Sequence, residues 1–212
     1  MVILFNQIYI MQRIYLLFPI LLFAFAACKK SNSGGSAMSI SEYPLKVNNQ
    51  WTYKVTDSMI NITDTAVLKI TSSYTKDDTT WWYCKMYYHN MLVDSPYYVQ
   101  TSNTIQFINN AYSFLSADFM IDFPVSDNNT WMASTLSQDT AVAKLLTSPL
   151  IVGGRGYSNV YMISRGFSLI DYNFRQNIYV SKGVGLIAED YAIMPFGPQI
   201  KKHIELISYS LN

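Results

Sequence analysis

Apolar and polar residues alternate over short stretches along most of the chain that follows residue 40. In one stretch Trp51, Tyr53 and Val55 alternate with Thr52 and Lys54. Alternation with a period of two is typical of a β-strand that buries one face, and the clusters of Asn, Asp, Gly, Ser and Pro between the stretches are typical of turns. The pattern predicts strands at residues 51–55, 65–74, 81–89, 97–101, 104–108, 157–167, 176–181 and 200–211.

Two segments depart from this alternation. Residues 140–146, TAVAKLL, favour a short helix because Ala, Lys and Leu have high helix propensities. Residues 111–121 are apolar without a clear period, which is compatible with a strand or with a helical turn. The chain therefore predicts an all-β fold with minor α content, and its length indicates one domain.

The most apolar stretch lies near the start, at residues 14–28, and it has the form of an export signal. Arg13 supplies a positive charge, residues 14–24 an apolar run, and Ala26-Ala27 the small residues of a cleavage site. Cys28 directly after them is typical of a lipoprotein signal, although Phe25 stands where Leu is usual. The alternatives are plain secretion or an uncleaved anchor, but a membrane span needs about 20 apolar residues and this run is shorter.

These features predict three regions. Residues 1–27 are a signal peptide whose true start is Met11, because the apolar residues 1–10 precede the charge. Residues 28–39 are a lipidated cysteine and a flexible Gly/Ser-rich tether. Residues 40–212 form a single β domain, held at a membrane by the lipid on Cys28. Lysines rather than Asp after Cys28 favour the periplasmic side of the outer membrane.

Composition excludes some classes of protein. Charged residues make up 14% of the chain, against about 25% in typical globular proteins. Removal of Arg13 with the signal leaves 14 basic and 14 acidic residues, so the charge gives no footprint for nucleic acid. Cys84 is the one cysteine besides Cys28, which excludes an internal disulfide and a cysteine-rich metal site.

No recognisable catalytic motif is present, so we expect a protein that is not an enzyme and uses no cofactor or metal. The GxSxG, HExxH and P-loop patterns are missing. His89 and His203 fit structural or surface roles, Cys84 fits a buried hydrophobic position, and residues 153–156, GGRG, fit a loop better than a phosphate cradle. Whether the carboxylates converge in space stays open for Asp118, Asp122, Asp127, Glu189 and Asp190.

Aromatic residues are the best candidates for a binding surface. The chain has 17 Tyr and 4 Trp residues, several of them in the predicted strands. They either fill a β core and its rim or line a groove for sugar rings or acyl chains, since Tyr and Trp combine an apolar face with a polar group. The candidate ligand-binding residues are Trp81, Tyr83, Tyr87, Tyr97 and Tyr98. We therefore expect a binding domain for an apolar or glycan ligand; the alternative is a structural or assembly lipoprotein of the cell envelope.

A short pattern occurs twice, 80 residues apart. Residues 43–51, YPLKVNNQW, and 123–131, FPVSDNNTW, share an aromatic-Pro start, an Asn-Asn pair and a Trp. The shared pattern predicts a Pro-started segment, a tight turn at Asn-Asn and a buried Trp in each copy. Chance, or a shared turn type without shared ancestry, is the alternative.

The first copy resembles the opening of a family of uncharacterised, exported bacterial lipoproteins, [YF]-P-L-x-x-G-N-x-W-x-Y. Residues 43–45, Asn49, Trp51 and Tyr53 match it, and residues 183–186, GVGL, match the closing turn of that family. Asn48 departs from the usual glycine. The resemblance implies a twisted, antiparallel, partly closed β-sheet, similar to the half-barrels that carry lipids or lipoproteins across the periplasm, and it assigns no functional residue. If the sheet curls in this way, its concave side is the natural binding site, and we expect the five aromatic candidates on or beside it.

Overall fold

The structure, a computed structural model, describes residues 36–58, 61–109, 118–133, 139–168, 172–195 and 200–212. The proposed signal, Cys28 and residues 29–35 of the proposed tether lie outside the described residues, as does most of the ambiguous segment 111–121. Within the described residues no helix has the length and apolar character needed to cross a bilayer.

The described residues form strands almost throughout, which confirms the all-β fold class. A single 3-10 turn, η1 (Ile40–Glu42), precedes the strands. The strands are β1 (Gln50–Asp57), β2 (Ile62–Lys76), β3 (Thr79–Tyr88), β4 (Met91–Asp94), β5 (Tyr97–Gln100), β6 (Thr104–Ile108), β7 (Phe119–Asp122), β8 (Thr130–Met132), β9 (Thr140–Leu145), β10 (Leu150–Val152), β11 (Arg155–Tyr157), β12 (Val160–Ser168), β13 (Tyr172–Ser181), β14 (Gly185–Pro195) and β15 (Ile200–Ser210).

The helix expected at residues 140–146 is wrong, because this segment forms strand β9. Ala141 and Ala143 point inward and are almost fully buried, while the alternate residues Thr140, Val142 and Lys144 are exposed. β9 pairs antiparallel with both β8 and β12. Burial of every second residue between two neighbouring strands therefore outweighs the helix propensity of Ala, Lys and Leu, which is a weak preference.

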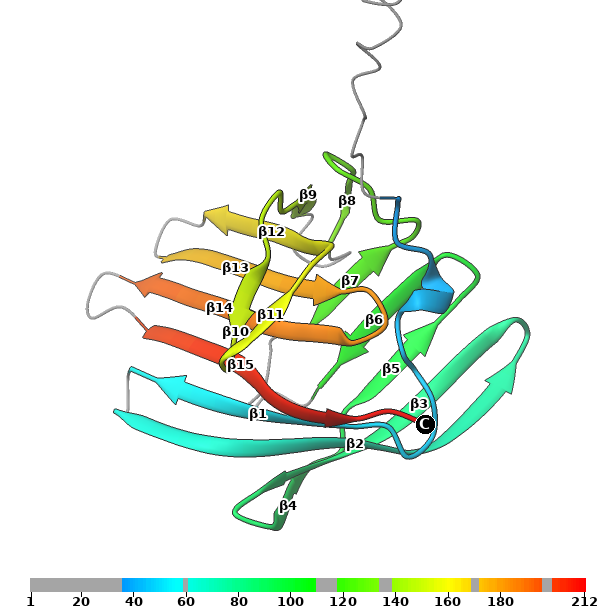
Figure 1. Cartoon of the computed structure of the whole chain (residues 1–212), viewed down its shortest axis with the longest axis horizontal. Helices are drawn as coiled ribbons and strands as arrows, with labels where there is room; N and C mark the ends of the chain where they lie inside the picture. Colours follow the sequence, from blue (N-terminus) through cyan, green and yellow to red (C-terminus); the bar gives the residue numbers. More distant parts are fainter. Residues whose placement is uncertain (1–35, 59–60, 110–117, 134–138, 169–171, 196–199) are drawn as a thin grey trace, which may run out of the picture. The chain divides into compact units, whose positions relative to one another are not determined.

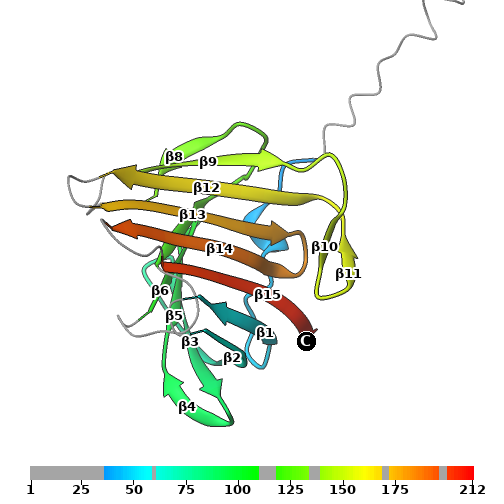
Figure 2. The ribbon, with the colours of Figure 1, turned by 90° about the vertical axis from the view of Figure 1, so that its left-hand side faces the viewer.

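The described strands form one 13-stranded antiparallel sheet and a separate hairpin of β10 and β11. The order in the sheet is β7-β6-β5-β3-β2-β1-β15-β14-β13-β12-β9-β8, with β4 paired to β3 outside this path. The sheet curls until its two ends approach each other, as Figures 1 and 2 show. Trp131 Nε1 on β8 donates a hydrogen bond to Met120 O on β7 at 2.9 Å. The sheet is therefore a nearly closed barrel, as the sequence predicted.

The inward side chains of the barrel pack into one hydrophobic core cluster. Large members such as Tyr53, Phe107 and Tyr161 are almost fully buried. Cys84 lies in this cluster as a free thiol, and burial raises its pKa to about 12. The expectation that Cys84 is a small buried hydrophobe is thus confirmed, and its thiol stays protonated at neutral pH.

The two copies of the repeated pattern share their Asn-Asn turn, although the Phe123–Pro124 peptide bond of the second copy is cis and the Tyr43–Pro44 bond of the first is trans. Asn48 and Asn128 both have positive φ, 72° and 64°, which asparagine tolerates better than most residues. In the first copy Asn49 Nδ2 donates to Pro44 O at 2.7 Å, and in the second Asn129 Nδ2 donates to the carbonyl five positions earlier at 3.0 Å. A shared hydrogen-bonding pattern therefore accompanies the shared sequence.

Each copy also ends in a buried tryptophan, as predicted. Trp51 is 2% exposed and Trp131 is 8% exposed. The indole of Trp51 donates to Val184 O at 2.7 Å, just as Trp131 donates to β7. Trp51 is the second residue of β1 to pair with β2, and Trp131 is the second residue of β8 to pair with β9. The two units thus start two strand pairs of one sheet in the same way.

The sequence predicts that the β domain begins at Ile40. In the structure the packed part of the chain begins a few residues earlier. Met38 is fully buried and forms a two-way backbone bridge with Val125, at 2.8 and 2.9 Å. Lys182 donates to Ser36 Oγ at 2.8 Å and pairs with Glu42 at 3.1 Å. Residues 36–39, which the sequence assigned to the tether, therefore pack with the domain.

Candidate functional sites

The five aromatic residues proposed as a binding surface lie on two different faces of the sheet. Cys84 and Met86 point inward on β3, so Trp81, Tyr83 and Tyr87 point outward, because successive residues of a strand face opposite sides. On β5, Tyr97 faces outward opposite Tyr83, and its neighbour Tyr98 faces inward. The expected shared position on the concave side does not match this placement.

Tyr98 is a core residue. It is 2% exposed, and its ring lies 4.9 Å from the ring of Phe107 and 6.1 Å from that of Tyr43. Burial holds the pKa of Tyr98 well above its usual value. Contacts of this kind stabilise the barrel and leave the ring out of reach of a ligand.

The outward rings gather on neighbouring strands. The ring of Trp81 lies 5.9 Å from that of Tyr74 on β2, and the ring of Tyr83 lies 6.5 Å from that of Tyr97. Tyr74 is 54% exposed and Tyr83 is 45% exposed. We call Tyr74, Trp81, Tyr83 and Tyr97 the aromatic face. Tyr87 lies on the same side, opposite Val67 of β2 and Leu92 of β4.

A second arrangement, a cluster of polar groups inside the barrel, brings together residues that the sequence did not link. Gln176 Nε2 donates to Glu189 Oε1 at 2.7 Å, and the guanidinium of Arg165 donates to Gln176 Oε1 and to Asp118 O. Arg165 Nη1 also lies 3.6 Å from Asp139 Oδ2. Because Asp118 leads into β7 and Arg165 lies on β12, this cluster ties the two ends of the sheet together.

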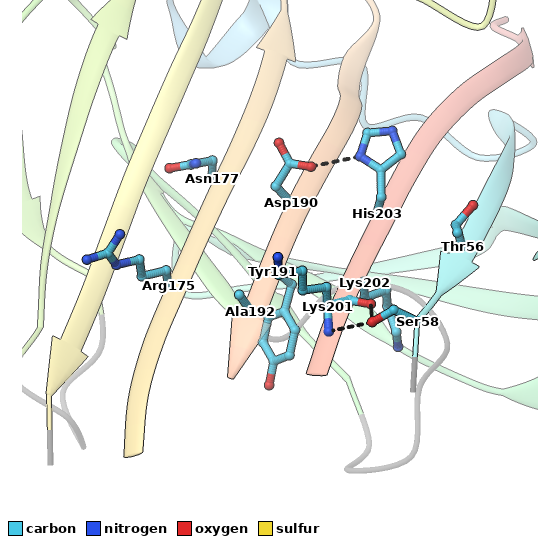
Figure 3. Close-up of a pocket in the computed structure, with 10 residues that line it drawn as sticks. All are labelled: Thr56, Ser58, Arg175, Asn177, Asp190, Tyr191, Ala192, Lys201, Lys202 and His203. Atoms are coloured by element: carbon cyan, nitrogen blue, oxygen red, sulfur yellow. Dashed lines mark hydrogen bonds and ion pairs between the residues drawn. The ribbon is translucent and has the colours of Figure 1, made fainter. Parts of the chain in front are cut away.

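A third arrangement is a groove of about 370 Å³ on the outer face of β13, β14, β15 and β1 (Figure 3). Its floor contains a row of side chains, one from each strand: Asn177 pairs with Asp190, Asp190 with His203, and His203 with Thr56. The next row is Arg175, Ala192 and Lys201. Cavities that hold small ligands begin at about 300 Å³, so the groove is large enough for a small polar ligand.

An ion pair lies at the centre of the groove. Asp190 Oδ1 lies 2.7 Å from His203 Nδ1, and Tyr179 OH donates to Asp190 Oδ2 at 3.3 Å. The hydrogen bond to Asp190 raises the pKa of His203, and the bond to His203 lowers the pKa of Asp190. The surface role expected for His203 is therefore confirmed, and it includes a defined acidic partner.

The other histidine also has an acidic partner at the surface. His89 Nε2 lies 2.6 Å from Asp64 Oδ2, and the His89 side chain is 60% exposed. The bond to the backbone of Thr65 is the main cause of the lowered pKa of Asp64. Among the described residues, no group of three or more His, Cys, Asp or Glu side chains is arranged to hold a metal ion.

The glycine-rich segment 153–156 forms the turn and first strand residues of the β10–β11 hairpin. Gly153 has φ of 54° and lies so close to Leu206 O that a Cβ atom would collide with this carbonyl. Glycine is thus required for close packing of the hairpin on β15, which confirms the loop interpretation over a phosphate cradle. A smaller hollow of about 120 Å³ between this hairpin and the sheet adjoins the groove through Asp190 and His203.

No local residue pattern indicates the groove. Arg175, Asp190 and His203 come from three strands, and only the antiparallel register aligns them. A polar residue at an outward position reads as an ordinary solvent-facing residue of a half-buried strand. Taken alone, Asp190 and His203 are separate candidates, and only the register of β14 with β15 places them opposite each other.

The fold and these sites define an all-β protein with a nearly closed, packed antiparallel barrel and polar and aromatic features on its outer side.

No protein-family model matches the chain, and no curated protein matches it. Nine solved chains match in structure. One is a candidate lipoprotein from Parabacteroides distasonis, with a TM-score of 0.41 and 9% identity, matching over 82% of this chain and 100% of that one. Another is a candidate exported protein with a YmcC-like fold from Bacteroides fragilis, with a TM-score of 0.39 and 6% identity, over 82% of this chain and 99% of that one. Similarity this low does not extend either description to this chain.

Proposed function

We propose that this chain is an exported, lipid-anchored protein of the cell envelope whose barrel binds a glycan on the aromatic face, without catalysis. The observation that carries the proposal is the gathering of four aromatic rings, in two contacting pairs, on the solvent side of β2, β3 and β5. Tyr74 and Tyr83 keep about half of their surface exposed. Rings exposed together in this way suit a ligand that stacks on them.

A glycan fits this face better than an acyl chain does. The C–H faces of sugar rings pack against aromatic rings, and the tyrosine hydroxyls can hydrogen-bond to sugar hydroxyls. An acyl chain needs an enclosed apolar cavity, whereas the inward side chains of the described strands pack against each other in the core cluster. This contrast moves the proposed site from the concave side to the outer side of the sheet.

The proposed anchor would keep the barrel close to a bilayer. Ser36, where the described part begins, lies eight positions after Cys28. An extended chain covers about 3.3–3.6 Å per residue, so Ser36 can lie at most about 28 Å from the lipidated cysteine. A barrel held at that distance meets envelope glycans at high local concentration.

The test is glycan binding by the full-length protein in detergent solution. Envelope polysaccharide from the native host serves as the probe, and affinity electrophoresis measures retardation. We expect Trp81→Ala and Tyr83→Ala each to weaken binding about two- to tenfold, the equivalent of a typical aromatic contact. Tyr209→Ala is the matched control, because this ring lies on β15 and contacts Arg155 instead. Failure of the wild-type protein to bind, or equal losses in all three variants, would contradict the proposal.

An assembly role through protein contacts is the second candidate, and β4 favours it. This short strand lies outside the main path of the sheet, and Met91, Leu92 and Val93 are 64%, 52% and 39% exposed. Consecutive exposed apolar residues on a strand edge are typical of an interaction surface. A photo-crosslinker at Leu92 should then give one protein adduct in host cells, and one at the exposed Lys85 should not. Identical adduct patterns at both positions would argue against this role.

A further inference from the structure

The groove on β13, β14, β15 and β1 carries an inference that does not depend on the aromatic face. Its lining residues include Arg175, Lys201 and His203, but Asp190 is the one acidic residue among them. Both oxygens of Asp190 are already engaged, one by His203 and the other by Tyr179. Asp190 is therefore held against the groove wall, and the two outward cations, Arg175 and Lys201, outnumber this one acid.

Two cations of the groove form no ion pair with the part of the chain that the structure describes. Within the described residues neither Arg175 nor Lys201 forms an ion pair, and both side chains are exposed. Lys202 also borders the groove, but burial lowers its pKa and Asp57 and Glu189 are the acids that act on it. The positive charge that faces a ligand is thus that of Arg175 and Lys201, with His203 added when it is protonated.

The space between these two cations is open because the residue between them is small. Ala192 pairs with Arg175 on one side and with Lys201 on the other. Arg175 and Lys201 lie on the strands to either side of Ala192 (Figure 3), and the methyl group of Ala192 fills little of the groove between them. Asn177 and Thr56 add an amide and a hydroxyl group in the neighbouring row. The groove therefore presents mainly hydrogen-bond donors around a shallow pocket.

We propose that this groove is a binding site for an oxyanion, a carboxylate or phosphate group, on a ligand about the size of one sugar residue. Guanidinium groups bind both kinds of anion in a bidentate manner, and an ammonium group adds a point charge. His203 donates from Nε2 when it is protonated, because Nδ1 already holds the proton of the contact with Asp190. The ligand is anchored by its charge over Ala192, and Asn177 and Thr56 contact its uncharged part.

Calorimetry on the full-length protein in detergent solution tests this site, with glucuronate, glucose 6-phosphate and glucose as the probes. The two anionic sugars should bind, and glucose should bind at least about tenfold more weakly. Raising the salt concentration from about 50 to 200 mM should weaken the anion binding. Tighter binding of glucuronate would identify a carboxylate ligand and tighter binding of glucose 6-phosphate a phosphate ligand. Equal binding of glucose, or binding of none of the three, would overturn the proposal.

Variants separate the groove from a general charge effect. Arg175→Gln and Lys201→Gln should each weaken anion binding at least about fivefold, and Lys85→Gln, which removes an exposed lysine from the outer side of β3, should leave it unchanged. Ala192→Leu fills the hollow without altering charge and should also abolish binding, which keeps the test valid if an Arg175 variant misfolds. Unchanged binding in folded Ala192→Leu protein, or an equal loss in Lys85→Gln, would refute the site. Neither result bears on the aromatic face, whose residues lie on other strands.

Discussion

At the scale of single residues, His203 and Asp190 show how a strand register creates chemistry from isolated side chains. Each residue faces the solvent on its own strand, and about half of each side chain is exposed. Their 2.7 Å contact shifts both pKa values, that of His203 upward and that of Asp190 downward. The two shifts report one interaction, so they are not independent contributions to stability.

The pH dependence of this pair follows from the directions of the shifts. The contribution of His203 is fully present below its ordinary pKa of 6.5 and is lost as the pH rises through its raised value. The contribution of Asp190 is present above its ordinary pKa of 3.8 and is lost as the pH falls through its lowered value. The pair thus stabilises the protein most between about pH 4 and pH 6.5.

We predict that Asp190→Asn moves the pKa of His203 down toward 6.5, because the amide cannot stabilise the imidazolium by charge. An NMR titration of the two histidines measures this, and His89, which pairs with Asp64, serves as the internal control. A His203 pKa that stays raised in the variant would show that other neighbours cause the shift. Glu205 is the nearest alternative, since it also favours the protonated form.

At the scale of elements, the two Pro-Asn-Asn-Trp units are the part of the fold that the sequence specified most fully. The Asn-Asn turn is local, so the sequence could predict it from residue types alone. The buried face of β1 could also be predicted locally, from the alternation of apolar and polar residues: Trp51, Tyr53 and Val55 are all buried. The two indoles donate to Val184 O, in the turn between β13 and β14, and to Met120 O on β7, and the patterns around each Trp do not indicate these partners.

Tertiary pairing explains where the sequence interpretation failed. β9 is a strand because β8 and β12 enclose it, and nothing within residues 140–146 records those neighbours. The five aromatic candidates share a residue type but not a face of the sheet, because the alternation along β5 places Tyr97 and Tyr98 on opposite faces. The groove residues depend on three strand pairings at once, two between consecutive strands and one between β1 and β15, with register shifts next to Tyr179 and Tyr53. Single-sequence patterns give the faces of strands more readily than the order in which strands pair.

For the paired tryptophans we predict that Trp51→Ala and Trp131→Ala each lower the free energy of unfolding by roughly 3–5 kcal/mol, the usual cost of removing a buried aromatic side chain. Trp51→Phe should cost less, because it keeps most of the ring and loses the hydrogen bond to Val184 O. Denaturant unfolding followed by circular dichroism gives these values. A cost below about 1 kcal/mol for either alanine variant would mean that its unit does not anchor the sheet.

At the scale of the whole molecule, the proposed anchor and the barrel make separate predictions. We expect the mature protein to begin at an acylated Cys28 and to remain with the membrane fraction, because two acyl chains hold a protein firmly. Intact-mass spectrometry of the protein from its host measures the added mass. The Cys28→Ser variant should move to the soluble fraction. Retention of residues 14–27 in the mature protein, or membrane retention of the variant, would contradict the anchor.

The closure of the barrel rests on side chains where the strand ladder ends. β7 and β8 are the two ends of the strand order, and the described contacts across this seam run from side chains to backbone carbonyls. Trp131 on β8 contacts Met120 O, and Arg165 contacts Asp118 O from β12, which is separated from β8 by β9. Because Arg165 also contacts Gln176 and lies near Asp139, one guanidinium group on β12 links β13 and the residues that lead into β7 and β9.

We predict that Arg165→Ala opens this seam and lowers the free energy of unfolding by about 3–5 kcal/mol, since it removes a buried cation that acts on the carboxylates of Asp139 and Glu189. Hydrogen exchange should accelerate in β7 and β8 before it does in β1 and β15. Arg155→Ala is the matched control, because Arg155 also lies 5.2 Å from an aromatic ring, that of Tyr209, but is exposed and forms no ion pair in the described structure. That variant should cost less than about 1 kcal/mol. Equal small costs for the two variants would mean that the backbone and core alone hold the barrel closed.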